Sequence, residues 1–361
     1  MSTFRIASTL FFIVLHTLLL AQQPQDSTGS IPARTTARDT ISIIGVGDMM
    51  MGSNYGSGIL PPHDGAGLMA DVQDLLKSAN LTFGNLEGVV MDSGGTAKTC
   101  KDPKVCYVFR TPVRYVANLT NAGFDMMSIA NNHAGDFGDI GRKSTMRTFE
   151  GAGIEFAGQL QKPIAIVTRD GVRYGLAAFA PNSNCVSLND IAFAKKVVAK
   201  LDSMVDVVIV SFHGGAEGPQ YQHVPRKTET FYGENRGNVY AFAHAVIDAG
   251  ADVVFGHGPH HTRAIEVYKN RFIAYSLGNF CTYGMNISGV NGLAPIIKVY
   301  TNPKGEFYQA HITSTDQSER LKVRVDVEKR VLQRIKQLTK EDFPESTINI
   351  GDDGWVRKST N

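Results

Sequence analysis

The chain has 361 residues, of which 43% are hydrophobic and 19% are charged, and its formal net charge is +2. This composition supplies the core of one large domain or two ordinary ones. The near-neutral charge excludes a polyelectrolyte binder. The chain also lacks the basic stripe that is typical of nucleic-acid-binding proteins, so no nucleic-acid partner is expected.

Residues 1–21 have the order of a secretory signal peptide. Arg5 precedes an apolar run that ends in Leu18-Leu19-Leu20-Ala21, and a small residue at that point is typical of a cleavage site. We therefore expect export to the periplasm or cell envelope, with an uncleaved membrane anchor as the alternative. Residues 22–40 are rich in Gln, Ser, Thr and Pro and are predicted to form a disordered linker.

The four cysteines fit an exported protein. Cys100 and Cys106 flank a short turn sequence, which favours a local disulfide bond between them. Cys185 and Cys281 each stand alone in the sequence. They are predicted to be buried free thiols, and a disulfide bond between them is the alternative.

Strands and helices alternate along the chain from Ile41 to Thr313, which indicates an α/β fold. Hairpins are expected around Asp170-Gly171, the strongest turn signal, and around Lys269-Asn270. Helices are expected at 68–78, from Pro112 to Gly123, and at 141–151, 190–201 and 239–249. Further strands are expected at 41–46, 81–84, 125–130, 205–211, 252–255, 295–300 and 307–313.

Three segments lie outside this alternation. Residues 89–104 are predicted to form an exposed polar excursion, and residues 214–236 a loop with the length of a functional lid. Residues 325–338 are predicted to form a charged helix before a polar tail. No linker interrupts the chain after Ile41, so we expect one domain over 41–315, followed by the helix and tail of 316–361.

The predicted parallel strands end in residues that can bind metals. The strand at 252–255 leads into a Gly/Pro loop with His257, His260 and His261, and four other strands end near Asp48, Glu87, Asn132-His133 and His213. Ligands of α/β proteins bind at such carboxyl ends. Each Asp or Asn alone is more typical of a cap or turn. Five strand ends of this kind together favour a common site.

The candidate metal ligands combine oxygen and imidazole groups without thiolates, a set that suits one or two ions of Mn, Fe or Zn. A carboxylate that can bridge, with histidines on separate loops, is the composition of a two-metal hydrolase. His133 would be free to donate a proton to a leaving group. His244 is assigned to the core, and His63, His223 and His311 have no supporting pattern. The predicted ligands are Asp48, Glu87, Asn132, His213, His257 and His260.

These motifs resemble the CapA/PgsA family of poly-γ-glutamate capsule synthesis proteins. The resemblance runs from about Ile41 to about Ile312, and it implies the two-sheet α/β sandwich between helical layers found in calcineurin-like metallophosphoesterases. The motifs that carry it are Gly47-Asp48-Met49-Met50, Asn85-Leu86-Glu87, Ala130-Asn131-Asn132-His133 with Asp136-Phe137-Gly138, Ser211 to Glu217, Gly256-His257-Gly258-Pro259-His260 and Tyr275 to Phe280.

The wider metallophosphoesterase pattern is matched in part. Met50 stands where that pattern has a histidine, Ala134 stands where it has the acidic partner of His133, and one extra residue separates His257 from His260. Glu217 is a candidate ligand or base that would compensate.

The resemblance implies two functions. The first is a metal-dependent hydrolase of phosphoesterase type, acting on a phosphate ester or on an envelope polymer. The second is a non-enzymatic component of a membrane complex for capsule polymer synthesis or export.

Overall fold

The computed structural model describes residues 40–100, 106–285, 287–318 and 322–359. The predicted signal peptide and linker lie outside the described residues. All described residues belong to one structural unit. Among them, every helix is too short or too polar to cross a membrane.

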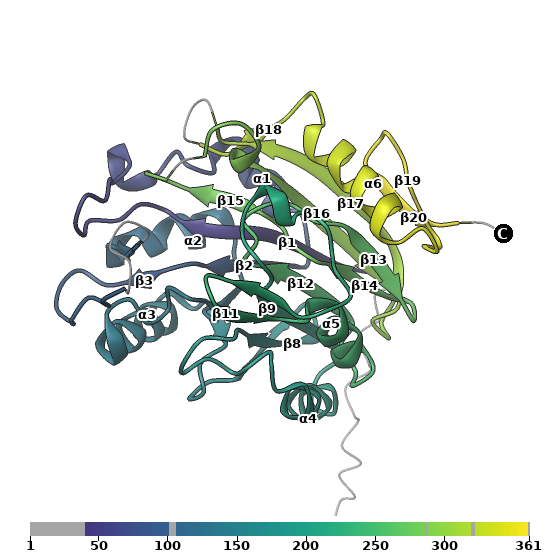
Figure 1. The fold of residues 1–361 in the computed structure, drawn as a ribbon, viewed down its shortest axis with the longest axis horizontal. Helices are drawn as coiled ribbons and strands as arrows, with labels where there is room; N and C mark the ends of the chain where they lie inside the picture. Colours follow the sequence, from purple (N-terminus) through teal and green to yellow (C-terminus); the bar gives the residue numbers. More distant parts are fainter. Residues whose placement is uncertain (1–39, 101–105, 286, 319–321, 360–361) are drawn as a thin grey trace, which may run out of the picture. The chain divides into compact units, whose positions relative to one another are not determined.

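The first β-sheet contains the four parallel strands β1, β2, β5 and β6 and continues on the other side of β1 as antiparallel strands (Figure 1). Its order is β19-β20-β17-β16-β1-β2-β5-β6, and β15 pairs with the end of β1. The strands are β1 (Ile41–Met50), β2 (Leu81–Leu86), β5 (Met126–Ser128), β6 (Glu155–Ala157), β15 (Asn279–Thr282), β16 (Leu293–Thr301), β17 (Phe307–Asp316), β18 (Arg324–Val325), β19 (Ile348–Ile350) and β20 (Trp355–Lys358).

The second sheet has the order β13-β14-β12-β9-β8-β7 and is parallel from β14 to β8. Its strands are β7 (Ile164–Arg169), β8 (Val172–Phe179), β9 (Val207–His213), β12 (Val253–His257), β13 (Ile265–Tyr268) and β14 (Arg271–Ala274). Central strands such as β9 and β12 are buried along their whole length. This explains their nearly continuous apolar sequence, since a parallel sheet is covered on both faces.

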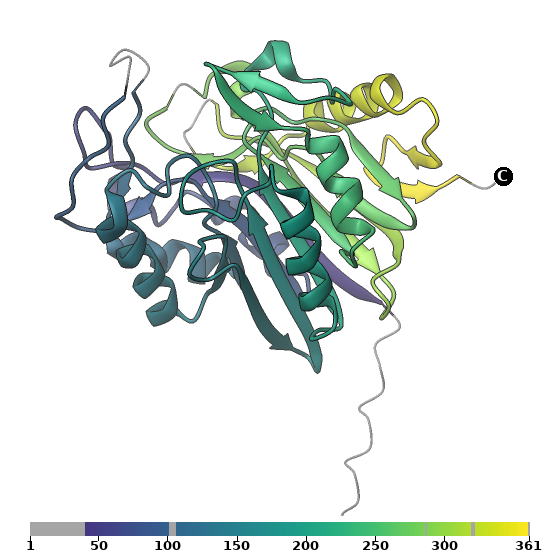
Figure 2. The same ribbon diagram turned by 60° about the horizontal axis from the view of Figure 1, so that its bottom comes forward.

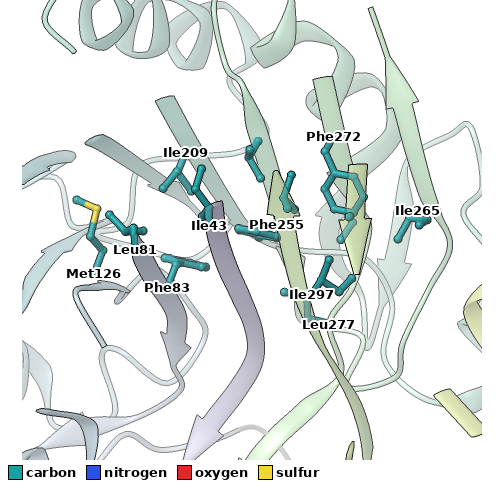
Figure 3. Close-up of a cluster of buried hydrophobic side chains, with 14 of the residues drawn as sticks. Ile43, Leu81, Phe83, Met126, Ile209, Phe255, Ile265, Phe272, Leu277 and Ile297 are labelled. Carbon is teal, nitrogen blue, oxygen red and sulfur yellow. The ribbon is translucent and has the colours of Figure 1, made fainter. Parts of the chain in front are cut away.

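The two sheets face each other across one apolar core (Figure 3). The rings of Phe83 from β2 and Phe255 from β12 stack across it with their centroids 5.6 Å apart. Gly45 permits this approach, because a Cβ at that position would lie 2.5 Å from the Phe255 ring. The carboxyl ends of the parallel strands from both sheets are thereby held close together.

Helices cover the outer faces of both sheets. Buried residues of α1, α2 and α3 pack on the first sheet, and those of α4 and α5 pack on the second (Figure 2). The helices are α1 (Gln73–Leu76), α2 (Val116–Ala122), α3 (Gly138–Ala152), α4 (Ile191–Asp202), α5 (Val239–Ile247) and α6 (Arg330–Asp342). This arrangement confirms the predicted α/β fold with two sheets between helices.

Local sequence signals explain several element boundaries. Asp170 and Gly171 both have positive φ angles, so the β7–β8 hairpin forms where the turn was predicted. Gly123 ends α2 in the left-handed conformation that glycine adopts without strain. The Asp190 side chain caps α4 by accepting a hydrogen bond from the backbone of Phe193.

Other segments differ from the predictions. The helix expected at 68–78 is reduced to a 3-10 turn and the four residues of α1. The C-terminal helix begins at Arg330, and the predicted polar tail contributes β19 and β20 to the first sheet. The excursion at 89–104 is not wholly exposed, because β3 (Val89–Val90) is buried and pairs with β4 (Arg110–Thr111). The division into a domain at 41–315 and a separate tail stays a prediction.

The cysteines behave as predicted. Cys100 and Cys106 form a disulfide bond. Cys185 and Cys281 are free thiols, and both are buried.

Candidate metal centre

The predicted ligands come together at the carboxyl ends of strands from both sheets. Asp48 lies on β1, whose strand continues two residues beyond it to Met50, and Glu87 follows directly after β2. His213 and His257 are the last residues of β9 and β12 and lie side by side in register. The apolar strands thus carry these side chains into one buried location.

The loop after β12 has an unusual backbone. Gly258 has a φ of 108°, and a Cβ there would lie 2.9 Å from the Gly214 nitrogen and 3.2 Å from the His213 ring. His260 has a φ of 61°, in the left-handed region that residues other than glycine seldom adopt. Such strain is concentrated at functional sites. Here it accompanies the turn that brings His260 back towards Asp48.

Asp48 is the centre of the first group of contacts. Its side chain is buried and accepts a hydrogen bond of 2.8 Å from the Asn85 amide. Nδ1 of His260 lies 3.1 Å from Oδ2 of Asp48. Nδ1 of His257 lies 3.2 Å from Oδ1, but the two groups are not aligned for a hydrogen bond. Two imidazoles therefore converge on one buried carboxylate.

Glu87 is the centre of a second group. Its Oε1 lies 3.6 Å from Nε2 of His260, 3.9 Å from Nε2 of His213 and 4.0 Å from Nε2 of His133. Ligand atoms of Asp48, Glu87 and His260 lie within 4.8 Å of one another. The separations from Glu87 are too long for direct hydrogen bonds and leave room for an ion between the side chains.

Several buried polar atoms at this location have no hydrogen-bond partner among the described residues. They are Glu87 Oε1 and both ring nitrogens of His213 and His257. Leaving a buried polar group unpaired costs about 1–3 kcal/mol each. A divalent cation would satisfy these atoms together, so the residues present fit a metal ion with oxygen and nitrogen ligands.

The pKa shifts at the site differ in direction, and those of Asp48 and His213 suit a bound cation. Burial raises the pKa of Asp48, but contacts with His257 and His260 outweigh it and hold that pKa well below its usual range. Burial raises the pKa of Glu87 although the charge of His260 opposes it. Burial lowers the pKa of His213 well below the usual value. An ionised Asp48 and a neutral His213 are the protonation states that metal binding requires.

His133 lies beside this group with a carboxylate partner of its own. Its Nδ1 lies 2.8 Å from Oδ2 of the buried Asp136, while its Nε2 faces Glu87. Lys98 forms an ion pair of 2.6 Å with Asp136, and the Phe109 backbone donates to the same carboxylate. The acidic partner expected to be missing at Ala134 is therefore supplied by Asp136, three residues after His133.

The Glu217 carboxylate is divided between two partners, so it is not positioned only for a metal ion. Its Oε2 lies 3.9 Å from Nε2 of His260, and its Oε1 pairs with Arg236 at 2.9 Å. Arg236 is only 2% exposed, and the sequence analysis did not identify it. It follows Glu217, which lies in a loop, by 19 residues, so no motif spacing joins the two. Asn132 is half-buried next to His133, and the described contacts leave its role as a ligand a prediction.

The segment predicted as a lid is anchored rather than free. It contains a hairpin of β10 (Glu229–Phe231) and β11 (Glu234–Gly237). Arg263, which is fully buried, forms two hydrogen bonds to the Glu229 carboxylate at 3.0 and 2.7 Å and a third to the Ala216 carbonyl. This buried ion pair fixes the start of the segment next to Glu217.

Replacing Arg263 with alanine is expected to destabilise the protein by about 3–5 kcal/mol, because it leaves the Glu229 charge buried and unpaired. Urea unfolding followed by circular dichroism measures this change. The matched control is Arg173→Ala, which removes an exposed ion pair with Asp206 and should leave the unfolding midpoint nearly unchanged. Equal midpoints for the two variants would contradict the anchoring role.

Met50, His244 and His223 do not contribute an imidazole to the candidate metal centre. Met50 is buried and offers no ring nitrogen, so the position gives the site no imidazole. His244 is partly buried, contacts Glu266 at 2.9 Å and stacks on Tyr268, which agrees with a structural role. His223 instead contacts Asp342 on α6.

Comparison with known proteins agrees with the motifs. Residues 42–283 match the model of the family described as bacterial capsule synthesis protein PGA_cap. The capsule biosynthesis protein CapA of Bacillus anthracis is 28% identical over 291 residues, which cover 73% of this chain and 65% of that protein. The PGA biosynthesis protein CapA of Bacillus subtilis (strain 168) is 25% identical over 291 residues, which cover 76% of this chain and 71% of that protein.

The chain thus spans just under two thirds of the length of the B. anthracis relative. Among solved structures, a 5'-nucleotidase precursor from Thermus thermophilus aligns with 82% of this chain and 58% of its own, at 14% identity and a TM-score of 0.43. The family match covers more than half of the chain and includes every predicted ligand. This chain belongs to the bacterial capsule synthesis protein family, PGA_cap.

Proposed function

We propose that this protein is an exported, metal-dependent hydrolase that acts on an envelope polymer during capsule synthesis. The observation that carries the proposal is the convergence of Asp48, Glu87, His213, His257 and His260. Among the described residues, Glu87, His213 and His257 have buried polar atoms without a partner. The names of the two CapA relatives tie those proteins to capsule and PGA biosynthesis. A polyglutamate-type polymer is therefore the preferred substrate class, with a capsule synthesis complex in the membrane as the partner.

The proposed metal ligands come from both sheets. A divalent ion of Mn, Fe or Zn would supply Lewis-acid activation of water and would offset negative charge at the scissile group. Asp48 and Glu87 would hold that ion from the first sheet, and His213 and His257 would hold it from the second. His260 reaches both carboxylates, at 3.1 Å from Asp48 and 3.6 Å from Glu87. Asp48, Glu87, His213 and His257 are buried, whereas the His260 side chain is 25% exposed.

His133 is the proposed proton donor. Its Nε2 points towards Glu87, whereas its Nδ1 is held by Asp136. Asp136 fixes the ring orientation and favours the protonated imidazole, although burial lowers the pKa of His133. In this arrangement Nε2 is the atom that gives a proton to the leaving group. Lys98 and the Phe109 backbone in turn fix Asp136.

The direct test is hydrolysis by the metal-loaded protein. Purified protein with added Mn²⁺ is assayed for shortening of poly-γ-glutamate and for release of phosphate from a panel of phosphate esters. We expect polymer cleavage that EDTA abolishes and Mn²⁺ restores. If the protein cleaves phosphate esters but not the polymer, the substrate is a small phosphate ester and the polymer assignment is wrong. No turnover on any substrate by fully loaded protein would favour the non-enzymatic component of a capsule complex.

The proposed export makes a separate prediction about residues 1–21. Removal of this segment should leave a mature chain that begins near Gln22 in the envelope fraction. N-terminal sequencing measures the start of the chain directly. An intact Met1 in that fraction would instead indicate a retained anchor.

A further inference from the structure

A second surface with chemistry of its own lies on the antiparallel part of the first sheet. In one row across the strands, Lys298 of β16 is paired with His311 of β17, which is paired with Trp355 of β20. In the next row, Tyr300 is paired with Gln309 and Gln309 with Arg357. Paired residues share one face of a sheet. We call this surface, formed by Lys298, Tyr300, Gln309, His311, Trp355 and Arg357, the basic aromatic face.

The core side of these strands is already occupied. Val331, Leu332 and Ile335 of α6 belong to the same core as Ile312 and Val356 from β17 and β20. The residues of the basic aromatic face alternate with those core residues along the strands and are half-buried or exposed. In β20, for example, Val356 is fully buried, whereas its neighbour Arg357 has a 53% exposed side chain. The basic aromatic face is thus turned away from the core.

Cations and rings are interleaved on this face. The Arg357 guanidinium lies 5.3 Å from the Trp355 ring centroid, and the Lys298 ammonium lies 5.4 Å from that of Tyr300. Lys298 is held by the Ser78 carbonyl at 2.6 Å. Among the described residues, Arg357 has a carboxylate contact with Asp353 at 3.8 Å. Lys358 follows Arg357 on β20 and therefore points to the other side of the sheet, where it adds a positive charge at the sheet edge. The two cations of the face, Arg357 and Lys298, attract anions.

A hollow of about 560 Å³ adjoins the basic aromatic face at the end of β19 and β20. It is lined by Ile348, Asn349, Arg357, Lys358 and Ser359. Arg357 belongs both to this hollow and to the face, so the positively charged surface continues around the sheet edge. These strands lie outside residues 42–283, the segment that matches the family.

We propose that the basic aromatic face binds a stretch of a carboxylate-rich polypeptide polymer of the poly-γ-glutamate type. A γ-linked glutamyl chain alternates carboxylates with pairs of methylene groups. Arg357 and Lys298 complement the carboxylates on the face, and Lys358 does so at the adjoining hollow. The faces of Trp355 and Tyr300 suit the methylene groups. The identity of the polymer rests on the proposed function, whereas the charge and ring pattern does not. Such a face would hold the polymer on the protein away from the metal centre.

The chain offers a direct reporter, because Trp355 is its single tryptophan. Tryptophan fluorescence of the full protein is followed during titration with a poly-γ-glutamate oligomer at low and high salt. We expect a saturable change that weakens at high salt, since screening acts on exposed charges. Arg357→Gln should weaken apparent binding about threefold, and Arg357→Gln with Lys358→Gln about tenfold. Lys195→Gln, an exposed position on α4, is the matched control and should bind as wild type.

The outcomes separate this inference from the proposed function. A His257→Ala variant should show the same fluorescence titration, because the metal centre is not involved. Binding of the polymer without its cleavage would overturn the hydrolase assignment and would support the basic aromatic face as a binding surface. Cleavage with no fluorescence change, or equal binding by the Arg357 and Lys195 variants, would overturn the surface. Equal or tighter binding of a uronic acid polysaccharide would overturn the assignment to a polypeptide polymer.

Discussion

Replacing His257 with alanine is expected to remove most of the bound metal while the domain stays folded. His257 ends the buried strand β12, and both of its ring nitrogens lack partners among the described residues, so the change deletes a ligand. The contact of its ring with Phe83, at 5.9 Å between centroids, is also lost, but the other β12 residues keep their places in the core. Even residues that only orient a ligand affect metal affinity about 10–100-fold. The loss of a ligand should exceed about 100-fold. Metal per protein after dialysis, measured by mass spectrometry, provides the readout.

His213→Ala should behave in the same way, because His213 lies beside His257 in register. The control is His63→Ala at an exposed histidine outside the site, which should keep wild-type metal. Circular dichroism verifies that each variant is folded. Wild-type metal content in both the His257 and His213 variants would contradict the metal-centre assignment.

Replacing His133 with alanine should leave the metal content unchanged and lower turnover by about 10²–10⁴-fold, the contribution of a general acid. The physical reason is its position, with Nε2 4.0 Å from Glu87 and Nδ1 held by Asp136. Turnover is compared on substrates with poor and with activated leaving groups. Activated leaving groups need less protonation, so they should lose less rate.

Asp136→Asn supplies the matched variant for this test. It keeps His133 but removes the charge that orients its ring, so it should lose part of the turnover. The Asp136 charge raises the pKa of His133, so its loss should move the alkaline limb of the pH profile to lower pH, because a proton donor must be protonated. Loss of metal in step with activity in the His133 variant would make His133 a ligand and end its assignment as the proton donor.

The strand ends could be predicted from the sequence because buried parallel strands have continuous apolar runs. His213 and His257 lie at the ends of β9 and β12, next to glycines. This short pattern can be recognised in the sequence without knowledge of the tertiary contacts. The two-sheet arrangement followed from the resemblance of the motifs in order. Asp48 and His260 are 212 positions apart in the sequence. Strand topology predicts that they lie close together, but the distance between them follows only from the structure.

Other features depend on contacts that leave no local pattern. Arg236 pairs with Glu217 only because the β10–β11 hairpin folds back, and that hairpin turns at Tyr232-Gly233, which is not a strong turn signal. Asp136 replaces the acidic partner expected at position 134 because the chain turns after His133 and returns the carboxylate to Nδ1. Helix α1 is shorter than the helix predicted at 68–78, because a 3-10 turn followed by a single helical turn already buries the apolar residues of this segment.

Anomalous diffraction from crystals of the protein loaded with Mn²⁺ or Zn²⁺ tests the metal centre most directly. The account predicts one or two strong peaks among Asp48, Glu87, His213, His257 and His260, with metal-to-ligand distances of about 2.0–2.2 Å for nitrogen and oxygen. A fully loaded crystal with no anomalous peak between Asp48 and Glu87, or with its peaks only at surface residues, would contradict it.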